Sequence, residues 1–278
     1  MKTTTKVWLG ASALLALVVA LICCKIKTAE PSYQGKSLSE WMEEIDTDAV
    51  FNGNGELSST NKEIATALRA MGTNSVPILL GQLELSDSKI HDWIEELNRR
   101  QKIVKIPIGA DAWKSKAKAT RALVALGPTA KPFISQLVPL LYDTNKSIRA
   151  TAVLVAIGPE AYPAILTALQ HTNSNIRYHV LWGMGWCREK CAFAVPSLIS
   201  MLNDQDITAQ NIAIQVLGRI KSEPDITIPA LNKLLSSSDP AIFFNAAKAL
   251  EAFGTNSTAA LLVLQQYQAQ SGLAACRT

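Results

Sequence analysis

Short helical stretches rich in alanine and leucine run into a glycine six times along the chain, which limits what it can fold into. These glycines are Gly72, Gly127, Gly158, Gly185, Gly218 and Gly254. The first three are followed five residues later by a proline, at Pro77, Pro132 and Pro163. Glycine favours the position after a helix C-terminus, and proline favours the first turn of a helix. The unit is a helix, a tight turn and a second helix, and its repetition predicts an all-α fold, an α-solenoid.

The predicted solenoid spans residues 61–270, with about six repeats and an insertion at 86–113. First helices are predicted at 61–71, 115–126, 147–157, 175–186, 207–220 and 241–253. Second helices are predicted at 76–85, 130–142, 161–171, 193–202, 226–235 and 257–268. Residues 271–278 are expected to form a flexible tail.

Residues 28–60 precede the repeats and are predicted to form a tether and an N-terminal capping helix. Ser37 and Glu40 have the spacing of a capping box, and Trp41 lies on the apolar side of the helix that follows. Because an open solenoid end exposes apolar surface, we expect Trp41 to pack in this cap.

Two of the turns are predicted to be enlarged. Gly185 to Pro196 and Gly218 to Pro229 are each eleven residues apart, six more than the turns of the earlier repeats. Consecutive enlarged turns would lie side by side on one edge of the solenoid. Two interpretations are open: the enlarged turns form a recognition ridge, or they are longer loops without a binding role.

The first 27 residues are predicted to be a separate membrane segment. Val7–Cys24 is an uninterrupted run of 18 apolar or small residues with lysines on both sides. As a helix it would rise about 27 Å, close to the ~30 Å hydrocarbon core of a bilayer. A retained transmembrane signal anchor is the leading interpretation, and a cleaved signal peptide or a lipid-modified cysteine are the alternatives. Each predicts an extracytoplasmic, periplasmic location for the rest of the chain, provided that the N-terminus stays inside.

Cys187 and Cys191 form the sequence Cys-Arg-Glu-Lys-Cys in a predicted loop. In an oxidising compartment this pair is a candidate disulfide, and two reduced thiols are the alternative. A zinc site is disfavoured, because zinc needs about four ligands and only His171 and His179 are near in the sequence.

A basic stretch, residues 99–121, contains eight basic residues and one acid. The candidate binding patch within it comprises Arg99, Arg100, Lys102, Lys105, Lys114, Lys118 and Arg121. Such a patch suits an acidic protein, a lipid headgroup or nucleic acid. Nucleic acid is the least favoured, and the net charge of +4 is too small to indicate it alone. The alternatives are a solvated helix face, or contact with the acidic segment 30–56 of the same chain.

Trp182 and Trp186 are four residues apart in the first helix of the fourth repeat. The leading interpretation is core packing, in which the rings fill the space beside Gly183 and Gly185. An exposed binding anchor is the alternative.

The repeats resemble HEAT repeats, in the bacterial form grouped with the phycobilisome-lyase-like HEAT repeats. In that family the first helix often begins Asp-x-x-Val-Arg, and Ile148–Arg149 and Ile176–Arg177 match the last two positions. The resemblance implies an armadillo/HEAT-like superhelix. It also implies that Arg149 and Arg177 hydrogen-bond to the turn before each helix and align neighbouring repeats, which is a structural role. HEAT arrays serve many purposes, so the resemblance implies no single activity.

No catalytic motif accompanies the repeats. The chain lacks the His-Glu pairs of the di-iron hydroxylases with this architecture, and it lacks nucleophile-elbow, P-loop, zincin and dinucleotide motifs. We therefore expect no enzyme activity, cofactor, metal or small-molecule substrate. The predicted function is a membrane-anchored scaffold that binds a protein partner on a concave face lined by the second helices. The alternative is a lyase-like HEAT enzyme or an enzyme-maturation factor.

Overall fold

The computed structural model describes residues 30–45, 59–84 and 112–254, and every structural statement below refers to these ranges. Outside them lie the predicted membrane segment at 1–27, most of the insertion at 86–113, the second helix of the sixth repeat and the tail. No helix within the described ranges combines the length and the apolar character needed to cross a bilayer.

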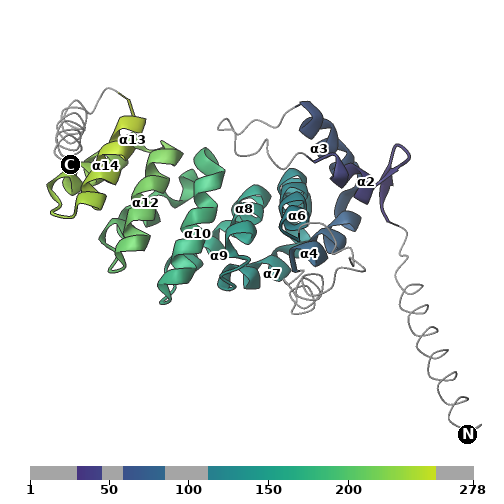
Figure 1. The fold of residues 1–278 in the computed structure, drawn as a ribbon, viewed down its shortest axis with the longest axis horizontal. Helices are drawn as coiled ribbons and strands as arrows, with labels where there is room; N and C mark the ends of the chain where they lie inside the picture. Colours follow the sequence, from purple (N-terminus) through teal and green to yellow (C-terminus); the bar gives the residue numbers. More distant parts are fainter. Residues whose placement is uncertain (1–29, 46–58, 85–111, 255–278) are drawn as a thin grey trace, which may run out of the picture.

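The described residues form one array of helix pairs that runs from α3 to α14 (Figure 1). The first helices are α3 (Ser59–Met71), α6 (Ala112–Leu126), α8 (Ser147–Ile157), α10 (Ser174–Cys187), α12 (Ile207–Ile220) and α14 (Pro240–Ala252). The second helices are α4 (Val76–Glu84), α7 (Ile134–Leu137), α9 (Tyr162–Leu169), α11 (Val195–Ser200) and α13 (Pro224–Lys233). Each first helix packs against the first helix of the next pair, so the helical solenoid predicted from the repeats is confirmed.

The second helices are short because 3-10 turns interrupt them. Around α7, η3 (Gly127–Phe133) comes before the helix and η4 (Val138–Tyr142) after it, so the predicted helix at 130–142 is not continuous. Pro132 and Pro139 lie in these flanking turns, and neither can donate the backbone hydrogen bond that a longer α-helix needs.

A small N-terminal unit precedes the array. Strands β1 (Ser32–Tyr33) and β2 (Lys36–Ser37) pair antiparallel and lead into α2 (Leu38–Glu43). Ser37 and Glu40 form the predicted capping box. Trp41 is buried in the core and α2 packs against α3, so the predicted role of Trp41 in the cap is confirmed.

The hydrophobic core runs along the whole array, and every repeat contributes side chains to it. Each first helix contributes at least one leucine that is 1% exposed or less: Leu68, Leu123, Leu154, Leu181, Leu217 and Leu250. Because these side chains belong to one continuous cluster, each helix pair buries apolar surface of its neighbours and not only its own.

Two of the six glycines do not end their helices. Gly72, Gly127, Gly158 and Gly254 have positive φ as expected, whereas α10 continues past Gly185 to Cys187 and α12 past Gly218 to Ile220. The residues with positive φ come three positions later, at Arg188 (φ 48°) and Lys221 (φ 53°). The prediction of two equivalent enlarged turns is therefore wrong. Residues 188–194 form a 3-10 helix, whereas only residues 221–223 join α12 to α13.

Close packing of the first helices explains the glycines inside them. A Cβ on Gly183 would lie 2.6 Å from the carbonyl oxygen of Ile148 and 2.7 Å from Cβ of Thr151, both in α8. A Cβ on Gly218 would lie 2.8 Å from Cα of Ala249 in α14. The rings of Trp182 and Trp186 were predicted to fill the space beside Gly183 and Gly185, and this detail is wrong, because α8 and the Arg219 side chain of α12 occupy that space. Core packing itself holds for Trp182.

We expect Gly183→Ala to lower the free energy of unfolding by about 1–3 kcal/mol, because the added methyl group forces α10 away from α8. Gly185→Ala in the same helix is the matched control. Its methyl group would meet the flexible end of the Arg219 side chain, at 3.0 Å, and alanine favours helix more than glycine does. Urea unfolding of the full chain in detergent, followed by circular dichroism, measures both variants. Equal losses would contradict backbone contact as the cause.

Candidate interaction surface

Three consecutive first helices begin at equivalent N-caps. Asn173, Asp206 and Asp239 cap α10, α12 and α14, and each side chain accepts a hydrogen bond from the N–H two residues further on. The caps are 33 residues apart, so residues separated by 33 hold the same position in successive helices. This spacing sets which side chains line up across the array.

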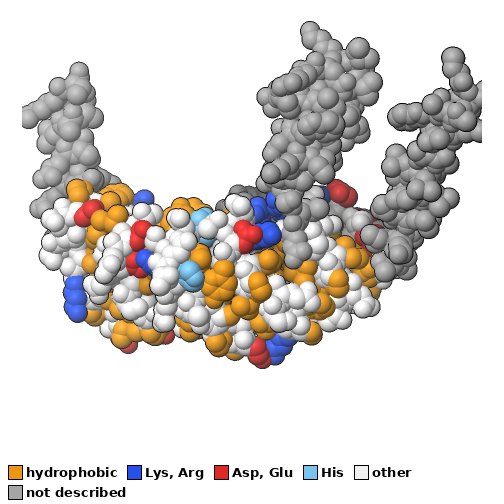
Figure 2. All heavy atoms as spheres, turned by 90° about the horizontal axis from the view of Figure 1, so that it is seen from below, with side chains coloured by type: hydrophobic (Ala, Val, Ile, Leu, Met, Phe, Trp, Pro, Cys, Tyr) orange, Lys and Arg blue, Asp and Glu red, His pale blue; other side chains and the backbone are white. Residues whose placement is uncertain are grey.

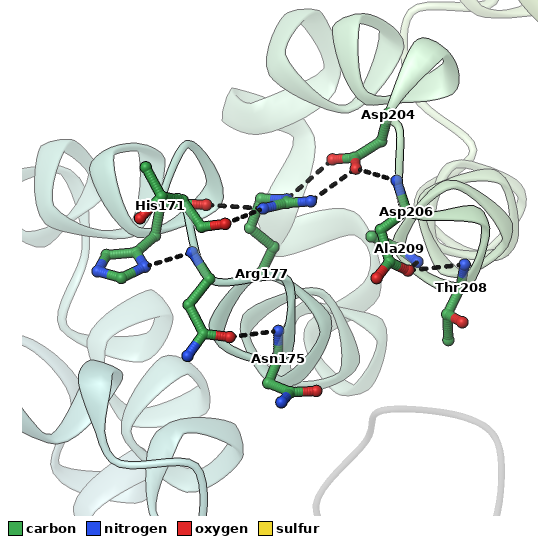
Figure 3. Close-up of polar contacts among 9 residues, drawn as sticks. His171, Asn175, Arg177, Asp204, Asp206, Thr208 and Ala209 are labelled. Carbon is green, nitrogen blue, oxygen red and sulfur yellow. Dashed lines mark hydrogen bonds and ion pairs between the residues drawn. The ribbon is translucent and has the colours of Figure 1, made fainter.

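A largely buried ion pair joins the turns at the start of α10 and α12. Nε and Nη2 of Arg177 donate to the two carboxylate oxygens of Asp204 at 2.9 and 2.6 Å (Figure 3). Its Nη1 donates to the carbonyl oxygens of His171 and Thr172 at 2.8 and 3.2 Å. The Arg177 and Asp204 side chains are 13% and 11% exposed. One guanidinium group therefore fixes the relative position of two consecutive repeats.

Asp206 is held as a carboxylate at the cap of α12. It accepts hydrogen bonds from the N–H of Thr208 at 2.9 Å and of Ala209 at 3.0 Å (Figure 3). The Ala209 N–H, the Ser174 side chain and the Thr208 N–H lower the pKa of Asp206. Because the folded pKa is depressed, this cap stabilises the fold above the unfolded pKa of about 3.9, and the stabilisation is lost as pH falls through the folded pKa.

The second arginine of the family pattern makes a local contact. Nη1 of Arg149 donates to the carbonyl oxygen of Asn145, in the turn before α8, at 3.4 Å. This bond lies within one repeat, whereas the Arg177 bonds also reach the next one.

The predicted basic patch is only partly within the described residues. Arg99, Arg100, Lys102 and Lys105 lie outside them. Lys114, Lys118 and Arg121 lie on α6, and Nζ of Lys118 donates to the Glu43 carboxylate at 2.7 Å. For Lys118, the acidic capping segment of the same chain supplies the partner.

Cys187 and Cys191 are neighbours with free thiols, at the end of α10 and in η6 (Arg188–Ala194). Their Sγ atoms donate to the carbonyl oxygens of Gly183 and Met184, each at 3.5 Å. The hydrogen bond with Cys187 and burial raise the pKa of Cys191. The Cys191 thiol is therefore protonated at neutral pH.

The outward side of α10, α12 and α14 is a continuous surface, which we name the first-helix face. The 33-residue spacing arranges it in three columns: Tyr178, Asn211 and Phe244; Trp182, Gln215 and Lys248; Trp186, Arg219 and Ala252. All nine side chains are half-buried or exposed. Because α12 packs against both α10 and α14, the columns cross the three helices without a break.

Aromatic rings hold both cations of the first-helix face. Cζ of Arg219 lies 5.8 Å from the ring centroid of Trp182, and Nζ of Lys248 lies 5.5 Å from that of Phe244. The rings of Tyr178 and Trp182 are stacked, with centroids 6.2 Å apart and planes at 10°. Such contacts orient the cations without cancelling their charge.

Amide side chains lie between the aromatic and cationic positions. Nδ2 of Asn245 in α14 donates to Oδ1 of Asn211 in α12 at 2.8 Å, and Nδ2 of Asn211 donates to the Ile207 carbonyl oxygen at 2.9 Å. Gln215 occupies the middle of the central column. The face thus offers both hydrogen-bond donors and acceptors.

The remaining surface is less distinctive. On the face seen in Figure 2, hydrophobic side chains are spread along the array and charged side chains lie as separate spots. Of the second helices, α9 and α11 expose mainly proline and small polar residues (Pro163, Thr167, Pro196 and Ser200), whereas α13 exposes Asp225, Ile226, Pro229 and Lys233. The described residues contain no group of three or more His, Cys, Asp or Glu side chains placed to hold a metal ion.

Sequence reasoning selected Trp182 and Trp186 but missed Arg219, Phe244 and Lys248. Trp186 is 42% exposed, so of its two interpretations the structure favours an exposed position, while Trp182 packs against the core. The spacing of the three capping residues was the signal that could have found the others, because it aligns α10, α12 and α14.

Comparison with known proteins supports the repeat type. Residues 195–268 match HEAT repeats, and no curated protein matches the chain. A crystal structure of an engineered protein from the Northeast Structural Genomics Consortium is 22% identical, with a TM-score of 0.34, and the match covers 74% of this chain and 95% of that one. A second engineered protein from the same consortium is 21% identical, with a TM-score of 0.33, over 70% of this chain and 63% of its own.

Removing Arg177 should lower the free energy of unfolding by about 3 kcal/mol, because Arg177→Met leaves the Asp204 carboxylate largely buried without its partner. The double variant Arg177→Met/Asp204→Asn should lose less than the sum of the two single variants. Lys131→Met is the control, since it removes an exposed pair with Glu160 and should change stability little. Urea unfolding measures all four variants. Similar losses for Arg177→Met and Lys131→Met would show that the Arg177 pair does not join the repeats.

Proposed function

We propose that this protein is a scaffold, held at a membrane by its N-terminal segment, that binds a protein partner on the first-helix face. The observation that carries the proposal is the exposed Trp186, one turn along α10 from Trp182, whose ring lies under the Arg219 guanidinium. Tryptophan, tyrosine and arginine are the residue types that most often dominate protein–protein binding energy. The match to HEAT repeats supports this function, because solenoids present extended binding surfaces.

The first-helix face is a better candidate than the second helices, to which the sequence assigned binding. On α9 and α11, side chains such as Pro163, Thr167 and Ser200 offer little area or charge for an interface anchor. On α13, the exposed Ile226 is aliphatic, whereas the exposed Trp186 of α10 is aromatic. The first-helix face combines rings, cations and amides within three adjacent helices.

The membrane anchor and the periplasmic location belong to the same proposal. They rest on Val7–Cys24, the apolar run with lysines on both sides. An oxidising compartment would also allow Cys187 and Cys191, which lie side by side, to form a disulfide.

Photo-crosslinking in intact cells tests the binding surface. We expect a benzophenone amino acid at Gln215, in the centre of the face, to give a discrete protein adduct of higher mass. Trp186→Ala should reduce that adduct by about tenfold or more, since truncating an interface anchor costs about 2 kcal/mol. The same photoreactive residue at Thr167 on α9 is the control. No adduct at position 215, or equal adducts at both positions, would contradict the proposed surface.

Protease treatment of spheroplasts tests the compartment. In spheroplasts with an intact membrane, the protease should degrade an exported chain down to its protected N-terminal segment. Cys187 and Cys191 should react with an alkylating reagent only after reduction. Mass spectrometry reads both results from one preparation. Full protection from protease until the membrane is lysed would place the solenoid in the cytoplasm and overturn the export proposal.

A further inference from the structure

We infer that residues 187–194, at the end of α10 and in η6, form a redox-controlled turn. A disulfide between Cys187 and Cys191 holds this turn closed against α9, and reduction of the two cysteines allows it to open. The inference concerns the turn and not the first-helix face, so it stands apart from the proposed binding function. The following contacts carry it.

The two thiols of the turn lie beside one another. Sγ of Cys187 donates to the carbonyl oxygen of Gly183, and Sγ of Cys191 donates to that of Met184, each at 3.5 Å. These carbonyl groups belong to consecutive residues of α10, and a hydrogen bond also joins the two thiols. Thiols in contact meet the first requirement of a disulfide, which is close approach.

The residue that reverses the chain between the cysteines is strained. Arg188 has φ 48° and ψ −125°, the conformation of the first central residue of a type II′ turn, where glycine is favoured. A side chain persists in such a backbone region only where the surrounding structure holds it. Because Cys187 comes directly before Arg188 and Cys191 three residues after it, a bond between the sulfur atoms closes the chain around the strained residue.

The same turn makes a contact between two repeats. Phe193 in η6 stacks on Tyr162, the first residue of α9, with ring centroids 3.6 Å apart and planes at 5°. Burial raises the pKa of Tyr162, and Cys191 and Cys187 raise it further, so the thiols lie close to the stacked rings. A closed turn therefore keeps Phe193 on Tyr162 and connects the fourth repeat to the third.

The exposure of the two thiols sets the order in which they react. Cys187 is half-buried and Cys191 is buried, so Cys187 meets an outside oxidant first. With glutathione disulfide as the oxidant, the Cys187 thiolate attacks one sulfur atom and releases a glutathione thiolate. Cys191 then loses its proton, attacks Sγ of Cys187 and releases the second glutathione thiolate. The two cysteines lose two electrons to the oxidant, and the two released thiolates take up the two protons.

The first step also makes the second easier. The largest cause of the raised pKa of Cys191 is its hydrogen bond with Cys187, followed by burial and by the charge of a Cys187 thiolate. Once Sγ of Cys187 carries glutathione it is neutral and no longer a thiolate, which leaves burial as the main cause. Cys191 therefore loses its proton more readily in the mixed disulfide than in the reduced pair.

A titration with glutathione tests the disulfide on the full chain in detergent. The protein is equilibrated in mixtures of reduced and oxidised glutathione, quenched with acid, alkylated and digested with trypsin. Cleavage after Arg188 and Lys190 separates the two cysteines, so a disulfide appears as residues 178–188 linked to residues 191–219. We expect this linked pair to be the main oxidised form of both peptides. Cys187 that carries glutathione without a link to Cys191 would overturn the inference.

Proteolysis of the folded wild-type protein tests whether the disulfide closes the turn. A lysine-specific protease is applied to the reduced and the oxidised protein, and mass spectrometry follows cleavage after Lys190 and after Lys221. Lys221 is the matched control, because it is exposed, has positive φ and lies in a turn without cysteine. We expect oxidation to slow cleavage after Lys190 about tenfold or more and to leave cleavage after Lys221 unchanged. Equal rates after Lys190 in the two states would contradict the inference, as would equal slowing after both lysines.

Arg188→Gly tests the contribution of the strained residue. Glycine adopts the Arg188 conformation without strain, so this variant should favour the closed turn and reach half-oxidation in glutathione mixtures about tenfold less oxidising. Lys221→Gly removes a positive-φ side chain from the next turn and should titrate as the wild type does. An unchanged midpoint in Arg188→Gly, or an equal shift in Lys221→Gly, would overturn the claim that the disulfide holds a strained turn.

The redox-controlled turn and the proposed function fail in different ways. Linked peptides together with no protein adduct at position 215 would overturn the scaffold function and leave this inference standing. A protein adduct at that position with no linked peptides at any glutathione ratio would do the reverse.

Discussion

The close approach of the first helices is the constraint on which the rest of this structure depends. Gly183 brings α10 against the backbone of α8, and Gly218 brings α12 against Ala249 of α14, at distances that leave no room for a Cβ. Helices that touch backbone to backbone have little freedom to slide or rotate, because interiors are close-packed and transmit strain. The outward sides of α10, α12 and α14 therefore hold a fixed relation to one another and form one surface.

Polar contacts at the helix starts set the register that close packing then maintains. The Arg177–Asp204 pair connects the turn before α10 with the turn before α12, and Asp206 caps the second of these helices. Since the two carboxylates follow one another in the same turn, the link between repeats and the start of the helix are fixed together. The 33-residue order of the columns on the first-helix face follows from this arrangement.

The sequence was sufficient to predict the repeated helix pairs, most first-helix bounds and the capping box, because these depend on local periodicity and capping chemistry. It could not distinguish the two uses of glycine. Gly158 ends α8 with positive φ, whereas Gly185 lies inside α10, and both follow similar helical stretches. Which use applies depends on the neighbouring helix, and that is not a local property. The same limit hid Arg219 and Lys248, whose positions matter only once α10, α12 and α14 are aligned.

The glycines and the tryptophans of α10 have a common physical cause. Gly183 lies on the side that faces α8, where a Cβ would meet the backbone, and Gly185 lies on the side that faces α12, where a Cβ would meet the Arg219 side chain. The two tryptophans of this helix lie elsewhere on its surface, where Trp182 is half-buried and Trp186 exposed. Close packing along α8 and α12 thus leaves Trp186 as the exposed aromatic residue of α10. Packing then depends on the sides of the helix and the proposed binding on its outer face, so the outer residues can change while the array stays intact.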